Sequence, residues 1–174
     1  MKQLRRGARI VAAVLALSLV KAPIAAAAQC VSASELEARQ VRLLQTELMV
    51  AALSCRHGEA YDYSEQYNAF VNKFRGSLQH HASVLKQEYR RSYGAQHEVV
   101  LDRYVTQIAN DASQRSIHAP NYCTTVRPLF DEVLGLKASE LPRFSERLSV
   151  ASESALLACT PGKQAAQKPK AQWQ

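Results

Sequence analysis

The side chains with the greatest capacity for chemistry in this sequence are four cysteines and five histidines. They are Cys30, Cys55, Cys123 and Cys159, and His57, His80, His81, His97 and His118. Zinc sites and redox sites commonly space two cysteines as C-x2-C, and no pair of cysteines here has that spacing. The cysteines therefore indicate structural disulfides, and we expect no cofactor.

A weak metal site is the alternative use of two of these histidines. His57 follows Cys55 and His118 precedes Cys123 by a few residues, so a Cys55–Cys123 bond would bring the two imidazoles together. Imidazole is a common ligand of transition metals. No regular ligand spacing supports such a site, so two solvent-exposed loop histidines are the plainer interpretation.

Tyrosine and arginine are concentrated at the two ends of the segment 61–93. The residues are Tyr61, Tyr63, Tyr67, Tyr89, Arg90, Arg91 and Tyr93. Both residue types are enriched where proteins recognise partners. Tyrosine also packs at the edge of a core, with its ring inside and its hydroxyl in water. These residues are therefore candidates for partner binding, with core-edge packing as the other interpretation.

Motifs that would indicate catalysis are missing from the sequence. It contains no G-x-S-x-G nucleophile motif, no glycine-rich phosphate loop and no C-x-x-C-H haem attachment motif. We therefore expect a protein that is not an enzyme.

The first 28 residues have the features of a secretory signal. Three arginines are followed by an apolar run from Ile10 to Val20, and Ala26–Ala28 offers an A-x-A cleavage site. The apolar run is too short to span a bilayer, which takes about 20 residues. We expect a signal peptide over 1–28, cut after Ala28. The mature protein would then be periplasmic or secreted and would have no transmembrane segment.

Removing the signal changes the charge of the chain. The full sequence has a formal net charge of +7 from 22 basic and 15 acidic residues. Five basic residues lie in the predicted signal, so the mature chain has 17 basic and 15 acidic residues and a net charge of +2. Nucleic-acid binding needs basic residues concentrated on one face. We therefore expect no nucleic-acid partner.

Residues 29–160 are long enough for one domain with its own core, and residues 161–174 form a Lys/Gln/Pro tail that we expect to be disordered. Apolar residues recur at helical spacing in the domain, without strand-like alternation. Expected helices run from Ser32 or Ser34 to about Ser54, and over about 64–93, 96–116, 122–134 and 139–158. Short connections favour antiparallel neighbours. The sequence predicts an all-α fold, a single up-and-down bundle of four to five helices.

The segment Leu43–Cys55 is expected to be the central helix of that bundle. Its second half is apolar on most faces, with Leu53 among the residues that widen its apolar stripe. A helix of this kind is surrounded by protein or lipid, and nearby charged residues disfavour lipid. Within the other helices, Gly76 could mark a kink or a close contact between helices, and Pro128 should begin or bend the helix over 122–134.

The bundle path limits how the cysteines pair. Cys30 and Cys55 flank a helix of about 30 Å, whereas a disulfide needs Cα atoms within about 7 Å. The third helix rises beside the first, so Cys123 should arrive near Cys55. We expect Cys55–Cys123, which leaves Cys30–Cys159 to join the two ends of the domain.

Four stretches of the sequence carry a resemblance. They are LQTELMVAALSC, YNAFVNKF, LDRYVTQIANDASQRS and the later Tyr122-Cys123. In these stretches the chain resembles a group of small uncharacterised exported (periplasmic) helical proteins of alphaproteobacteria. The resemblance covers about 44–123. It implies an exported helical protein with paired cysteines, and it implies no activity.

Two functional hypotheses follow from the sequence. The first is a non-enzymatic periplasmic helical protein that acts as an accessory envelope factor by binding an envelope protein or a peptide. The second is a helical bundle that binds a small ligand or, weakly, a transition metal through His57, His118 and a groove between helices. The sequence does not identify the partner or the ligand.

Overall fold

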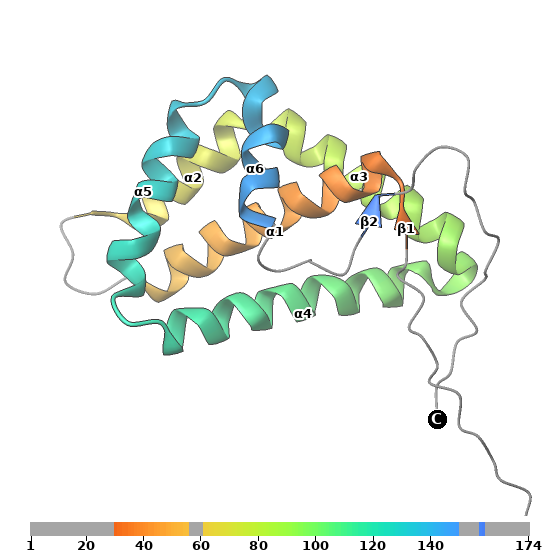
Figure 1. The fold of residues 1–174 in the computed structure, drawn as a ribbon, viewed down its shortest axis with the longest axis horizontal. Helices are drawn as coiled ribbons and strands as arrows, with labels where there is room; N and C mark the ends of the chain where they lie inside the picture. Colours follow the sequence, from red (N-terminus) through yellow and green to blue (C-terminus); the bar gives the residue numbers. More distant parts are fainter. Residues whose placement is uncertain (1–29, 56–60, 150–156, 159–174) are drawn as a thin grey trace, which may run out of the picture.

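The fold was analysed in a computed structural model, which describes residues 30–55, 61–149 and 157–158. The elements are β1 (Cys30–Val31), α1 (Ala33–Ser54), α2 (Tyr63–Lys73), α3 (Arg75–Tyr93), a 3-10 helix η1 (Gly94–Gln96), α4 (His97–His118), α5 (Tyr122–Gly135), a 3-10 helix η2 (Ala138–Glu140), α6 (Leu141–Ser149) and β2 (Leu157–Ala158). Apart from the two-residue strands, the described elements are helical (Figure 1). The predicted all-α class is therefore confirmed.

Helix α1 is the centre of the domain. It begins as predicted after Ser32, whose side chain accepts a hydrogen bond from the backbone N–H of Glu35 at 3.1 Å. The helix contacts each of the other five α-helices, and Leu44 and Leu48 are fully buried. The predicted central helix is confirmed. Leu53 departs from the expected stripe, because 58% of its surface is exposed at the end of the helix.

The predicted helix over 64–93 is two helices. α2 ends at Lys73, and α3 begins at Arg75 after a bend at Phe74, where φ is −103° and ψ is 14°. The kink was expected at Gly76, which instead lies inside α3. The bend lets α2 pack on α5 while α3 packs on α1 and α4, which one straight helix could not do. The Phe74 side chain at the bend is buried in the core.

Only the first part of the chain follows the predicted up-and-down path. α1 runs one way, α2 and α3 return, and α4 runs back along the long axis of the molecule (Figure 1). α5 and α6 then run across that axis, and α6 lies against α1. Pro128, which was expected to begin or bend its helix, lies inside α5.

The last predicted helix, over 139–158, is wrong at its end. Leu157 and Ala158 form β2, which pairs in parallel with β1 so that Cys30 lies opposite Leu157. This pairing depends on a segment that is distant in the sequence. The spacing of apolar residues along one segment carries no information about such a contact. The pairing brings the two ends of the domain together. None of the helices in the part of the chain that the structure describes is long and apolar enough to cross a membrane.

Candidate functional site

The disulfide between Cys55 and Cys123 is confirmed. It joins the end of α1 to the first turn of α5, with 5.6 Å between the two Cα atoms. The hydroxyl of Tyr63 donates a hydrogen bond to the Cys123 carbonyl at 2.6 Å, which ties α2 to the same point. The second predicted pair includes Cys159, which lies outside the described residues.

The first tyrosine group is built into the protein beside this disulfide. Tyr63 is fully buried, and its ring meets that of Phe130 edge-on at 5.7 Å. Tyr61 is half-buried and donates a hydrogen bond to Asp131 Oδ1 at 2.9 Å. Burial and the Asp131 carboxylate raise the pKa of Tyr61. Tyr67 is also half-buried and packs against the core.

The second tyrosine group lies at the opposite end of α1. The Arg39 guanidinium lies 5.2 Å from the centre of the Tyr89 ring and 4.8 Å from that of Tyr104. Tyr89 is buried, and the half-buried Tyr93 packs on its ring. The neighbouring Arg90 and Arg91 are exposed, and Arg91 pairs with Glu88.

The burial of Tyr63 and Tyr89 matters for the partner-binding hypothesis. A partner can touch neither ring unless the helices separate, so their positions match the packing interpretation. Of the seven residues proposed for partner binding, Arg90 and Arg91 are the exposed ones.

The histidines do not assemble a metal site in the part of the chain that the structure describes. His118 is exposed at the end of α4, with its Nε2 3.2 Å from Gln114 Oε1. His57 lies outside the described residues. Among residues 30–55, 61–149 and 157–158, no group of three or more His, Cys, Asp or Glu side chains could hold a metal ion.

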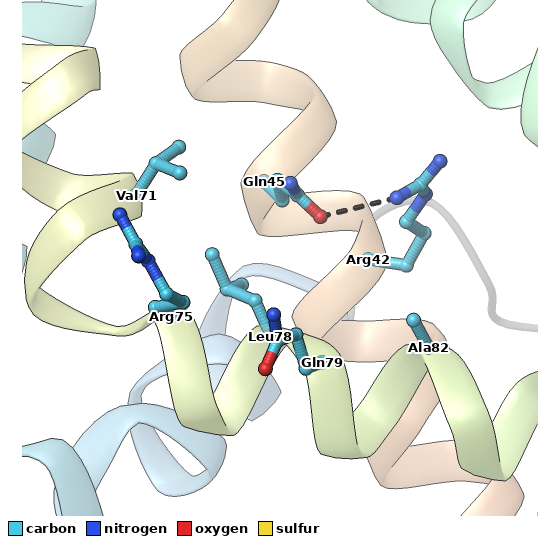
Figure 2. A pocket seen from close by; sticks show the side chains of 7 residues that line it. All are labelled: Arg42, Gln45, Val71, Arg75, Leu78, Gln79 and Ala82. Atoms are coloured by element: carbon cyan, nitrogen blue, oxygen red, sulfur yellow. Dashed lines mark hydrogen bonds between the residues drawn. The ribbon is translucent and has the colours of Figure 1, made fainter.

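An open groove lies between α1 and the α2–α3 pair. Its volume is about 390 Å³. The lining residues are Arg42 and Gln45 from α1, Val71 from α2, and Arg75, Leu78, Gln79 and Ala82 from α3. Figure 2 shows Arg42 and Arg75 on opposite sides, with Leu78 rising between them. The bend at Phe74 shapes this groove, because it sets the angle between Val71 and Leu78.

The two arginines of the groove are held by neutral groups. Arg42 Nη1 donates to Gln45 Oε1 at 3.2 Å, and Arg75 Nη2 donates to Asn72 Oδ1 at 3.0 Å. Neither forms an ion pair with a carboxylate of the described residues, whereas Arg39 and Arg115 each do. The Nε of Arg42 is buried and has no hydrogen-bond partner within the described structure. The groove therefore carries positive charge that its own side chains do not neutralise.

The chemistry of the lining suits binding. Val71, Leu78 and Ala82 offer apolar surface, and arginine and glutamine add their aliphatic stems. The lining contains no carboxylate, imidazole, thiol or hydroxyl side chain that could act as a nucleophile or a general base.

The sequence analysis did not identify this groove. Its arginines lie on the polar faces of amphipathic helices, where a charge is ordinarily solvated, so no sequence signal separates Arg42 and Arg75 from other exposed arginines.

Comparisons with known proteins identify no family for this chain. No protein-family model, no curated protein and no solved structure matches the chain. The resemblance to exported proteins of alphaproteobacteria stays a prediction from the sequence.

Proposed function

We propose that this chain is an exported, non-enzymatic helical protein of the cell envelope that binds a partner protein or peptide in the groove between α1 and the α2–α3 pair. The observation that carries the proposal is the pair of arginines, Arg42 and Arg75, that face an apolar floor without acidic partners among the described residues. Arginine beside apolar surface is typical of the residues that dominate protein recognition.

The predicted signal peptide and the disulfide support the location. A disulfide such as Cys55–Cys123 persists in an oxidising compartment, which the periplasm provides and the cytosol does not. The partner would therefore be another envelope protein or a peptide in that compartment.

Site-specific photocrosslinking tests this proposal in cells. A benzoylphenylalanine residue replaces Gln79, an exposed residue that lines the groove. The matched control replaces Gln107, an exposed glutamine on α4 that does not line it. We expect a discrete crosslinked product from position 79 and none from position 107, with the partner identified by mass spectrometry. Equal products at both positions, or none at position 79, would reject the groove as the binding site.

A further inference from the structure

We infer that the groove recognises an acidic peptide segment in which an apolar side chain lies between two acidic ones. This inference rests on the proposed function, since it specifies the chemistry of the partner at the same groove.

The lining of the groove carries two positive charges. Two of the seven lining side chains are guanidinium groups, and none is a carboxylate. A guanidinium offers a planar fork of donors that matches the two oxygens of a carboxylate. A segment with an acidic side chain at each side of the groove would place one carboxylate near Arg42 and the other near Arg75, which Figure 2 shows on opposite sides.

Arg42 is incompletely hydrogen-bonded within the described structure. Its Nη1 donates to a neutral amide at 3.2 Å, and its buried Nε donates to no described group. A buried N–H without an acceptor is unfavourable, because it has lost its hydrogen bond to water. Turning the guanidinium toward a bound carboxylate would exchange a neutral hydrogen bond for charged ones and would satisfy Nε. Arg42 is therefore better bonded with an anion than without one.

The lining also contains apolar side chains and two side-chain amides. Leu78 rises between the arginines, so the middle of the groove favours an apolar side chain (Figure 2). The side chains of Gln45 and Gln79 each carry both a donor and an acceptor. A peptide backbone has N–H and C=O groups to pair with them, which the hydrocarbon tail of a fatty acid lacks. The lining therefore favours a peptide over an anionic amphiphile.

Peptide binding to the purified protein tests the inference. The probe is a fluorescein-labelled peptide with Glu-Leu-Glu at the centre of a Gly/Ser chain. Its binding is measured by fluorescence anisotropy. Peptides with Gln-Leu-Gln and Glu-Ser-Glu at the centre test the acidic and the apolar requirement separately. Arg42→Gln and Arg75→Gln remove one guanidinium each, and Arg143→Gln removes an exposed arginine of α6 that does not line the groove.

We expect each groove variant to bind the Glu-Leu-Glu peptide about tenfold more weakly, which corresponds to about 1.4 kcal/mol, and the Arg143→Gln variant to bind as the wild type does. Both control peptides should bind more weakly than Glu-Leu-Glu. Circular dichroism melting checks that all three variants fold.

Four results would overturn the inference. One is equal binding of the Glu-Leu-Glu and Gln-Leu-Gln peptides, and another is an equal loss in Arg143→Gln. The third is displacement of the peptide by lauric acid or by phosphatidylglycerol vesicles at lower concentration than by unlabelled peptide, which would assign the groove to an amphiphile. A crosslink at position 79 that persists in the Arg42→Gln, Arg75→Gln double variant would refute the acidic ligand and leave the proposed partner site standing.

Discussion

At the scale of single residues, Glu47 joins three helices. Its Oε1 accepts a hydrogen bond from the Tyr122 hydroxyl at 2.9 Å, and its Oε2 accepts one from Arg115 Nη2 at 2.6 Å. The three residues belong to α1, α5 and α4. Burial and the nearby Glu47 carboxylate raise the pKa of Tyr122. The contact therefore depends on Tyr122 keeping its proton.

Replacing Tyr122 with phenylalanine removes this donor and keeps the ring. We expect Tyr122→Phe to lower the free energy of unfolding by about 1 kcal/mol, since one partner of a carboxylate is lost while Arg115 remains. Urea unfolding followed by circular dichroism measures the change. The control is Tyr67→Phe, because the Tyr67 hydroxyl has no hydrogen bond to the described residues, and its effect should be close to zero.

The hydroxyls of Tyr61 and Tyr122 make the stability of the fold depend on pH in the alkaline range. Tyr61 and Tyr122 both have a raised pKa in the folded protein, so the folded state keeps protons that the unfolded state loses above about pH 10. Their contribution is fully present below that pH and is lost as the pH rises further. We expect the melting temperature to fall above about pH 10, and to fall less in the Tyr61→Phe, Tyr122→Phe double variant. Parallel declines in both proteins between pH 9 and 11 would contradict this.

At the scale of elements, the glycines near the two ends of α3 have opposite roles. Gly76 lies inside the helix, and a Cβ added there would meet no atom within 4 Å. Gly94 caps the helix with a φ of +55°, in the region that favours glycine. Local freedom is therefore needed at Gly94 and unnecessary at Gly76.

Alanine at each position separates these roles. Gly76→Ala should raise the free energy of unfolding by about 0.5–1 kcal/mol, because alanine favours a helix interior and restricts the unfolded chain. Gly94→Ala should lower it by about 1 kcal/mol or more, because of the positive φ. Chemical denaturation of both variants against the wild type tests the pair, and a loss in Gly76→Ala would mean that the bend at Phe74 needs the glycine.

The disulfide holds two elements that are distant in the sequence. Cys55 and Cys123 are 68 residues apart, and the closed loop contains α2, α3 and α4. We expect the Cys55→Ala, Cys123→Ala double variant to lose about 2–4 kcal/mol of stability. Denaturant unfolding measures this loss. Adding a reductant to the variant then serves as a control, since any further loss must come from Cys30 and Cys159.

At the scale of the whole molecule, the first and last described segments of the domain, β1 and β2, pair with each other. The parallel pairing of Cys30 with Leu157 brings the start of the domain beside its end. We expect a mature chain that starts at Gln29 and carries two disulfides. Intact mass of the protein purified from the periplasm should therefore lie about four hydrogens below that of its reduced form, with no alkylation before reduction. Free thiols at Cys30 or Cys159 would leave Cys55–Cys123 as the single bond.

Several features of this protein could be predicted from the sequence because they depend on local chemistry. The cap at Ser32 and the helical periodicity located α1 to within a residue or two, and α4 was located in the same way. The length of α1 excluded one pairing of cysteines, and the helix order then led to Cys55–Cys123. These predictions needed only the rise of a helix and the direction of each connection.

The groove and the division of the long helix depended on tertiary structure. The bend at Phe74 lets α2 reach α5 and α3 reach α4 while both helices pack on α1, and Phe74 itself is neither proline nor glycine. Arg42 and Arg75 lie on opposite sides of one groove only because α1 packs against α3. The sequence by itself indicated most of the helical segments, since helix formation is governed largely by nearby residues, and it failed at 157–158, which pair with a distant strand. The tertiary structure decided which polar side chains share a surface, because that depends on contacts between helices distant in sequence.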